Sequence, residues 1–181
     1  GGSYGGNQDW FRTFMMRLGG CGAETACESS LYFAREFGFK NLYPFDCNQI
    51  KREEYVDFAH IMEDYLWPRI TGINKLSIYV KGYVKYLRDA EECRVEVSEF
   101  SWDNTYEDAA EKVKSQIDAG LPIPFLTLRH KDKAYNDYVW HWYLVNGYDD
   151  TEDGFKVKAV TYSGYKWLDF EGLWNTGCKP T

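Results

Sequence analysis

The sequence predicts an α+β fold, with a helical N-terminal half followed by an antiparallel sheet. Apolar residues recur at helical spacing up to about residue 90, whereas the segments after residue 120 are short, rich in β-branched and aromatic residues, and separated by turn residues. The chain has 181 residues, enough for one ordinary domain, and no repeat or linker-like segment follows residue 6. We therefore expect residues 7–181 to form a single domain, with residues 1–6 as a tail outside it.

Three helices are expected in the first half. Apolar residues from Ala23 to Phe37 fall close to 3.6-residue spacing, Gly38 stands where a helix C-cap belongs, and the first turn contains Cys21. The same spacing predicts a second helix over 55–66, stopped by Pro68, and a third over 76–87.

The second half changes texture. Residues 95–97 alternate in a strand-like way, and a helix is expected from about Thr105 to Ala119, ended by Gly120. Strands are expected over 121–128, 138–148, 155–162 and 165–168. Turn residues fall between or at the ends of these strands, at Lys131-Asp132-Lys133, Asn146-Gly147, Asp153-Gly154 and Ser163-Gly164.

Charge and hydropathy argue against two classes of partner. The net charge is −7 and no Lys/Arg run exceeds two residues, so the chain lacks the basic footprint of a nucleic-acid-binding protein. The longest apolar runs have about four or five residues, whereas a membrane-spanning helix needs about 20. We expect a soluble domain, slightly favour the cytoplasm, and leave secretion open because Gly1-Gly2 without a Met allows for a trimmed leader.

The cysteine count argues against a disulfide framework or a zinc site. The chain contains an odd number of cysteines and no Cys-x-x-Cys pair, so at least one thiol is expected to be free. No phosphate-binding glycine motif is present, and we expect no metal or other cofactor. The five cysteines are Cys21, Cys27, Cys47, Cys93 and Cys178.

Cys21 is the candidate nucleophile. A thiol at a helix N-terminus is exposed to partial positive charge and free N–H groups, which favour the thiolate. Three flanking glycines would allow a sharp turn and the approach of a substrate backbone, and the Cys21 N–H could bind an oxyanion. The alternative is a buried cysteine in a glycine-rich turn, the interpretation we adopt for Cys27. Glu24 and Glu28 would oppose ionisation of the thiol unless they point at N–H groups.

His141 is the candidate base. It lies within an otherwise apolar strand, where an imidazole costs stability unless it has a partner or a task. The alternative is a core histidine with satisfied hydrogen bonds. Strand alternation predicts that His141 shares a face with Val139, Tyr143 and Val145, opposite Trp140, Trp142 and Leu144. His60 and His130 are expected to be solvated surface residues.

Taken together, these segments resemble the papain-like cysteine peptidases, most closely the bacterial branch related to the bacteriocin-leader-processing peptidase domains that cut after double glycine. The resemblance covers most of the chain and is poorest over 40–105. It implies a papain-like fold, with the nucleophile helix packed on the sheet, and a peptide or amide substrate. The residues that carry it are Gly20-Cys21-Gly22-Ala23, Ile117 to Ile123, His141 to Asp149, Phe155 to Val160, Tyr165 to Leu168 and Phe170 to Trp174.

The chain departs from the family pattern at two positions. Relatives carry an oxyanion-binding Gln about six residues before the nucleophile, where this chain has Met15; Gln8 could serve only if the intervening stretch loops out, and is otherwise a solvated amide. The residue that orients the imidazole is usually Asp or Asn about 15 to 20 residues after the His. At that register Thr161 offers a hydroxyl, while Asp149 or Asn146 would have to turn back along the strand.

Three functions fit these features. The first is a thiol hydrolase, a peptidase or amidase with a Cys21–His141 dyad. The second keeps the fold without the chemistry, as a binding or regulatory module whose Tyr and Trp residues line a groove, although Trp140, Trp142 and Trp167 are more typical of a core. The third is an acyltransferase that passes the same thioester to an amine or thiol. The oligomeric state stays open.

Overall fold

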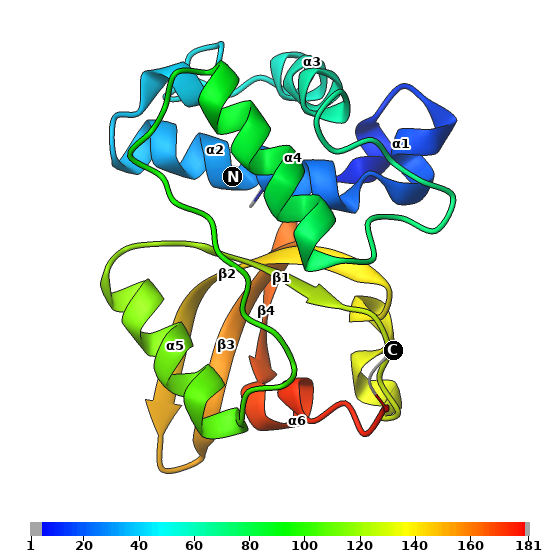
Figure 1. Cartoon of the computed structure of the whole chain (residues 1–181), viewed down its shortest axis with the longest axis vertical. Coiled ribbons are helices and arrows are strands. Elements are labelled where there is room, and N and C mark those ends of the chain that lie inside the picture. The colour runs from blue at the N-terminus through cyan, green and yellow to red at the C-terminus, as the bar shows by residue number, and fades with distance from the viewer. Residues whose placement is uncertain (1–4, 180–181) are drawn as a thin grey trace. The chain divides into compact units, whose positions relative to one another are not determined.

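The chain folds into two compact units, each described by itself here. The structure is a computed structural model that describes residues 5–179. The helical unit comprises residues 6–99 and the sheet unit residues 100–179, together with Gly5. Helices occupy the first half and an antiparallel sheet the second, so the predicted α+β class is confirmed (Figure 1). The predicted single domain over 7–181 stays a prediction, and the predicted tail lies mostly outside the described residues.

The helical unit is built around α2, most of whose residues are buried. Helix α2 starts at Cys21 and ends before Gly38, which has a φ of 70°, as the sequence predicts. The predicted helix over 55–66 ends three residues early, at Glu63. The elements are η1 (Gln8–Trp10), α1 (Phe14–Gly19), α2 (Cys21–Glu36), η2 (Lys40–Leu42), α3 (Arg52–Glu63) and α4 (Leu76–Asp89).

Buried tyrosines of α4 join the helices of this unit. Tyr79, Tyr83 and Tyr86 lie on one face of α4, with at most 5% of each exposed. The hydroxyl of Tyr83 lies 3.1 Å from that of Ser30 on α2, and the hydroxyl of Tyr86 donates to the carbonyl of Leu42 at 3.0 Å. The hydroxyl groups of Tyr83 and Tyr86 are therefore hydrogen-bonded inside the unit, which offsets the cost of burying them.

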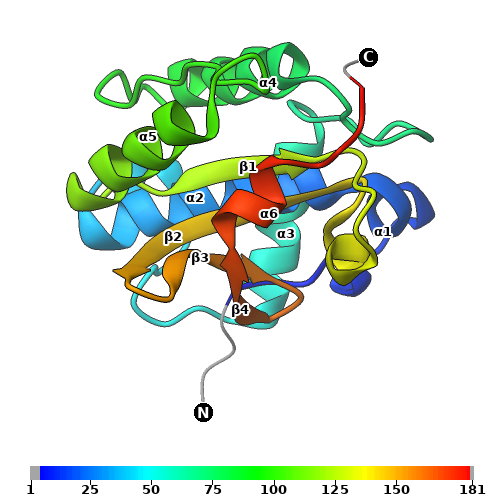
Figure 2. The same ribbon diagram turned by 90° about the horizontal axis from the view of Figure 1, so that it is seen from below.

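The sheet unit contains four antiparallel strands in the order β1-β2-β3-β4. Helices α5 and α6 pack on the sheet, and Tyr143, Val145, Val157 and Phe170 are central to the core between them (Figure 2). The elements are α5 (Tyr106–Asp118), β1 (Ile123–Thr127), η3 (Lys133–Tyr138), β2 (His141–Thr151), β3 (Gly154–Thr161), β4 (Gly164–Asp169) and α6 (Phe170–Trp174).

Three local predictions are wrong. Residues 95–97 form no strand. Asn146-Gly147 is not a turn but lies inside β2, where the pairing with β3 shifts register between Val145 and Tyr148, as in a β-bulge. Strand β2 begins only at His141, because residues 133–138 form a 3-10 helix and Trp140 has a φ of 59°, outside the β region.

Within residues 5–179, no helix combines the length and apolar character that a membrane span requires.

Candidate active site

Cys21 is the first residue of α2 and directly follows the single residue that separates α2 from α1. Gly20 is the only residue between α1 and α2, and no side chain caps the beginning of α2. Cys21 is not part of a disulfide, and 6% of the residue is exposed. The structure thus places the thiol where the sequence predicts, at the beginning of a helix whose axis points its positive end toward it.

The glycines around Cys21 serve close packing. A Cβ on Gly20 would lie 2.3 Å from the carbonyl oxygen of Met16, so only glycine fits at this junction. The same atom on Gly19 would lie 2.8 Å from the carbonyl oxygen of Arg69, and on Gly22 3.0 Å from Cδ1 of Ile73. The space beside Gly19 and Gly22 is filled by the chain itself and is not open to a substrate backbone.

Gln8 is held against both sides of the α1–α2 junction. Its Nε2 donates to the carbonyl of Arg17 at 3.0 Å, in the last turn of α1, and its backbone N–H donates to the carboxyl of Glu24, one turn into α2. The chain between Gln8 and Cys21 forms η1 and α1 before α2 begins. The intervening stretch therefore loops out, which is the condition that the sequence sets for an oxyanion role of Gln8. The carbonyl acceptor fixes which end of the carboxamide is the nitrogen.

The carboxyl groups of Glu24 and Glu28 point at hydrogen-bond donors. The N–H of Gly6 and the hydroxyl of Tyr55 each donate to Oε1 of Glu28 at 2.6 Å. Burial, and then the proximity of Glu28, raise the pKa of Glu24 to about 8, and burial also raises the pKa of Glu28. At neutral pH Glu24 is therefore largely protonated. The same apolar surroundings enclose Cys27, which is fully buried as predicted, and burial raises the pKa of its thiol.

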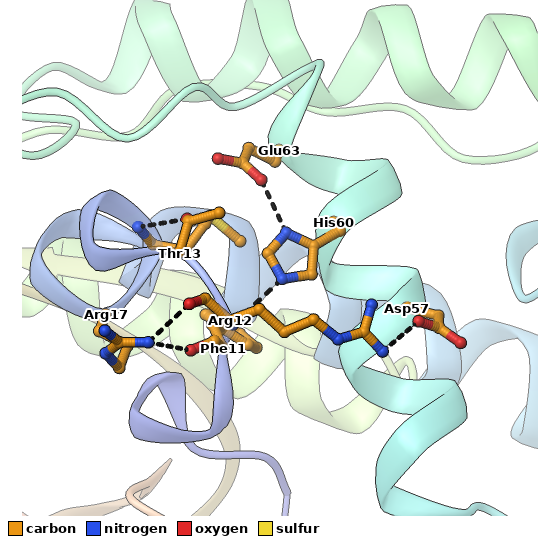
Figure 3. Close-up of polar contacts among 8 residues, drawn as sticks. Phe11, Arg12, Thr13, Arg17, Asp57, His60 and Glu63 are labelled. Atoms are coloured by element: carbon orange, nitrogen blue, oxygen red, sulfur yellow. Dashed lines mark hydrogen bonds and ion pairs between the residues drawn. The ribbon is translucent and has the colours of Figure 1, made fainter.

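The segment between Gln8 and α1 is fastened to α3 (Figure 3). Nε2 of His60 accepts from the N–H of Arg12 at 3.2 Å, and Nδ1 lies 2.7 Å from Oε2 of Glu63. Because Nε2 accepts, the ring proton is on Nδ1 and points at Glu63. The prediction that His60 is a solvated surface residue is therefore wrong. Arg12 also reaches Asp57, and Nη1 of Arg17 bonds the carbonyls of Phe11 and Arg12.

His130 also has a structural role that the sequence missed. Its Nε2 lies 2.9 Å from the carbonyl oxygen of Gly172, and its Nδ1 accepts from the N–H of Asp132 at 3.0 Å. The ring packs against that of Tyr135, with centroids 4.3 Å apart. His130 thus connects the β1–η3 loop to α6, and the prediction of a solvated residue is wrong.

His141 is a buried, neutral imidazole at the first position of β2. It pairs with Thr127 of β1, shares a face with the core residues Tyr143 and Val145, and is 5% exposed. Its predicted neighbour Val139 lies outside the strand. Burial lowers the pKa of His141 to about 4, because desolvation disfavours the charged ring. The ring is therefore neutral at physiological pH.

Thr161 holds one edge of this imidazole. Its Oγ1 lies 2.7 Å from Nε2 of His141, and the tautomer decides which of the two donates. The other two candidate orienting residues do not take this position. Asn146 and Asp149 lie five and eight residues farther along β2, which at about 3.3 Å per residue places them some 16 and 26 Å from His141.

Tyr162 covers the face of the same imidazole, a contact that the sequence analysis missed. The two rings are parallel, with centroids 4.7 Å apart and planes 3° from each other. Tyr162 and Ser163 form the tight turn that joins β3 to β4, and their φ values are 52° and 59°. A non-glycine residue in this region stores strain, which concentrates at functional sites. The short spacing from Thr161 to Gly164, between two predicted strands, was the available sequence signal for this tight turn.

A cavity of about 270 Å³ opens in the sheet unit beside the residues that contact His141. Ala159 forms part of its wall, and Asp137 and Lys166, which form an ion pair at 3.6 Å, contribute charges. Tyrosine rings dominate the rest of the lining, from Tyr138, Tyr162 and Tyr165. Of the tryptophans expected in the core, Trp142 is buried, whereas Trp140 and Trp167 are 48% and 46% exposed.

The candidate residues fall into two groups. Cys21 and Gln8 belong to the helical unit, and His141 and Thr161 belong to the sheet unit, so the Cys21–His141 dyad stays a prediction. Over residues 5–179, no group of three or more His, Cys, Asp or Glu side chains could hold a metal ion. A scan against protein-family models and searches of curated proteins and solved structures found no match.

Proposed function

We propose that this protein is a thiol hydrolase, a cysteine peptidase or amidase, in which Cys21 is the nucleophile and His141 the base. The observation that carries the proposal is the state of His141, a neutral imidazole held at one nitrogen by Thr161 and on one face by Tyr162. An imidazole held in this way is suited to taking and returning a proton in a fixed direction. The helix start at Cys21 supplies the matching environment for a thiolate.

The proposed reaction is acyl transfer through a thioester. In the tautomer with hydrogen on Nε2, Thr161 accepts that hydrogen, and Nδ1 of His141 has the lone pair that removes the thiol proton of Cys21. The sulfur then bonds the carbonyl carbon of the substrate, the amide C–N bond breaks, and the leaving amine takes the proton from His141. Water, deprotonated by the same ring, hydrolyses the thioester, and the thiol is restored together with a carboxylic acid.

Two further features support the proposal. The resemblance of the helix start and the His141 strand to the papain-like peptidases assigns the same roles to these two residues. Gln8, bound on both sides of the α1–α2 junction, offers a carboxamide nitrogen for the oxyanion of the tetrahedral intermediate. The substrate class implied is a peptide or amide.

An activated ester tests the proposal without knowledge of the natural substrate. With p-nitrophenyl acetate, we expect a burst of nitrophenolate equal to the enzyme concentration and one acetyl group on Cys21 by peptide mass mapping. Cys21→Ser and His141→Ala should abolish the burst, whereas Cys93→Ser, which removes an exposed thiol, should retain it. An unmodified Cys21, or acetylation that does not depend on His141, would refute the proposal.

One observation favours a second candidate, a binding module with the same fold. Both Cys21 and His141 are largely buried, and a hydroxyl rather than a carboxylate contacts the imidazole, which stabilises a positive ring less. In that case a peptide ligand would bind wild type and Cys21→Ala with the same affinity, and no acetyl-enzyme would form.

A further inference from the structure

We propose that Glu24 and Glu28, a buried and a partly buried glutamate on successive turns of α2, are positioning residues that hold the Gly6–Gln8 segment on α2 and so fix the Gln8 carboxamide at the beginning of the nucleophile helix. The proposal rests on the proposed function, in which that carboxamide binds the oxyanion. It assigns a task to two polar groups that otherwise have no reason to lie inside the unit, where 6% of Glu24 is exposed.

Glu28 holds the first residue of the segment. Its Oε1 accepts from the N–H of Gly6 at 2.6 Å and from the hydroxyl of Tyr55 on α3 at 2.6 Å, so one oxygen joins the segment, α2 and α3. The segment runs tightly against the Tyr55 ring, because a Cβ on Gly6 would lie 2.3 Å from it. Glycine at position 6 is therefore a requirement of this contact.

Glu24 holds the last residue of the segment. Its carboxyl accepts from the backbone N–H of Gln8, while Nε2 of Gln8 donates to the carbonyl of Arg17. The main chain of Gln8 is thus bound one helical turn after Cys21 in sequence, at Glu24, and its side chain about one turn before Cys21, at Arg17. A carboxamide nitrogen has two hydrogens, and the Arg17 carbonyl takes one. We assign the second to the oxyanion.

The surroundings make the contact at Glu24 dependent on its proton. The titratable groups that face Glu24 are Glu28 and Cys27 on α2, Asp9 on η1 and Tyr55 on α3, and none of them is basic. If Glu24 and Glu28, one helical turn apart, were both ionised, they would repel each other strongly, because the interior of the unit screens charges less than water does. Glu28, with two donors on one oxygen, is the member of the pair better suited to carry charge. Glu24 then holds Gln8 as the neutral acid.

Two substitutions of Glu24 separate its possible roles. Glu24→Gln keeps the shape and an acceptor oxygen but cannot ionise, whereas Glu24→Leu removes the acceptor. Glu36→Gln, at the exposed end of the same helix, is the matched control. In amide NMR spectra of the full chain, the backbone and carboxamide resonances of Gln8 should titrate with a midpoint near pH 8 in wild type and in Glu36→Gln, and should not titrate in Glu24→Gln.

Hydrogen exchange measures whether the segment is held. In Glu24→Leu and Glu28→Leu we expect the N–H groups of Gly6 and Gln8 to exchange at least about tenfold faster than in the control. Unchanged exchange in both variants, or a Gln8 titration that persists in Glu24→Gln, would overturn the proposal. These readouts need no catalysis, so they decide the positioning role even if wild-type Cys21 is never acetylated, an outcome that would refute the proposed function alone.

A kinetic comparison then connects the positioning role to the reaction. We expect Gln8→Ala and Glu24→Leu each to slow acetylation of Cys21 by p-nitrophenyl acetate by about 100-fold, the lower end of the range for loss of one oxyanion donor. Because Glu24 acts through Gln8, the double variant should be no slower than Gln8→Ala. Losses that multiply in the double variant would contradict the proposal.

Discussion

Oγ1 of Thr161 and Nε2 of His141 lie 2.7 Å apart on one face of the antiparallel β2–β3 pair. The register of the pair, with Leu144 opposite Val160, places Thr161 opposite Tyr143 and hence diagonal to His141. Two neighbouring strands therefore fix the separation of the hydroxyl and the ring. The imidazole is oriented by the sheet itself.

Replacing Thr161 tests this contact. Valine has nearly the same shape as threonine but cannot hydrogen-bond, so in Thr161→Val the Nε2 of His141 loses its partner. We expect acetylation of Cys21 to slow about tenfold, equivalent to about 1.4 kcal/mol, and the free energy of unfolding to fall by about 1–2 kcal/mol. Thr161→Ser, which keeps the hydroxyl, should restore most of both. Equal rates for wild type and Thr161→Val would show that the contact has no part in the reaction.

Stability at acid pH should report the burial of His141. Its pKa falls from 6.5 in the unfolded chain to about 4 in the folded one, so the unfolded state binds more protons between these values. The contribution is complete above pH 6.5 and is lost as pH falls toward 4, at about 1.4 kcal/mol per pH unit. We expect urea unfolding across this pH range to show that the free energy of unfolding of wild type falls by about 3 kcal/mol more than that of His141→Gln. Parallel curves would contradict it.

Stability at alkaline pH should report Glu24 with the opposite sign. Its pKa rises from 4.5 to about 8 on folding, so the folded state binds more protons between these values. Stability from this group is complete below pH 4.5 and declines through pH 8, at about 1.4 kcal/mol per pH unit. Glu24→Gln should therefore unfold at higher urea concentration than wild type at pH 8 to 9, and Glu36→Gln should not. A wild-type curve that does not fall over this range would exclude a buried, protonated Glu24.

The glycines at the α1–α2 junction should differ in their tolerance of alanine. Gly20→Ala would place Cβ 2.3 Å from a backbone carbonyl oxygen, which cannot move without breaking α1, whereas Gly22→Ala meets only the end of the Ile73 side chain at 3.0 Å. We expect Gly20→Ala to lower the free energy of unfolding by about 3 kcal/mol or more and Gly22→Ala by about 1 kcal/mol. Thermal unfolding of the two variants measures the difference. The reverse order would contradict the packing of this junction.

The sequence predicted most elements because their local signals agree with the fold. Helix α2 ends beside Gly38, Thr105 caps α5, and the β3–β4 turn, at Tyr162-Ser163, falls within one residue of the predicted Ser163-Gly164. Local signals failed where the pattern was ambiguous. Asn146-Gly147 is a good turn pair in isolation, but the β2–β3 pairing continues through it as a bulge. The alternation at 95–97 has no partner strand, and alternation alone does not form a sheet.

Local sequence features predicted the position of Cys21 at the beginning of a helix, the position of His141 in a strand, and Thr161 as the residue that contacts His141. The candidate site was not predictable where the contact joins distant segments. Arg12 and His60 are 48 positions apart in sequence, and Gly6 and Glu28 are 22 apart, so local sequence patterns give no sign of these hydrogen bonds. The stacking of Tyr162 on His141 was missed because the short spacing between the two strands indicates a tight turn but not which ring a tyrosine in that turn will contact. The sequence indicated that Glu24 would oppose ionisation of the thiol. It did not show that the backbone N–H of Gln8 is the donor to Glu24, because η1 and α1 separate the two residues in sequence.

The rate of alkylation of Cys21 by iodoacetamide, followed by mass mapping from pH 5 to 9 in wild type and His141→Ala, tests the central claim most directly. Exposed Cys93 in the same chain is the internal reference for an ordinary thiol. We predict that Cys21 reacts faster than Cys93 between pH 5 and 7 and that His141→Ala removes this advantage. A Cys21 that reacts more slowly than Cys93 at every pH, or at a rate that His141→Ala leaves unchanged, would contradict a thiol activated by His141.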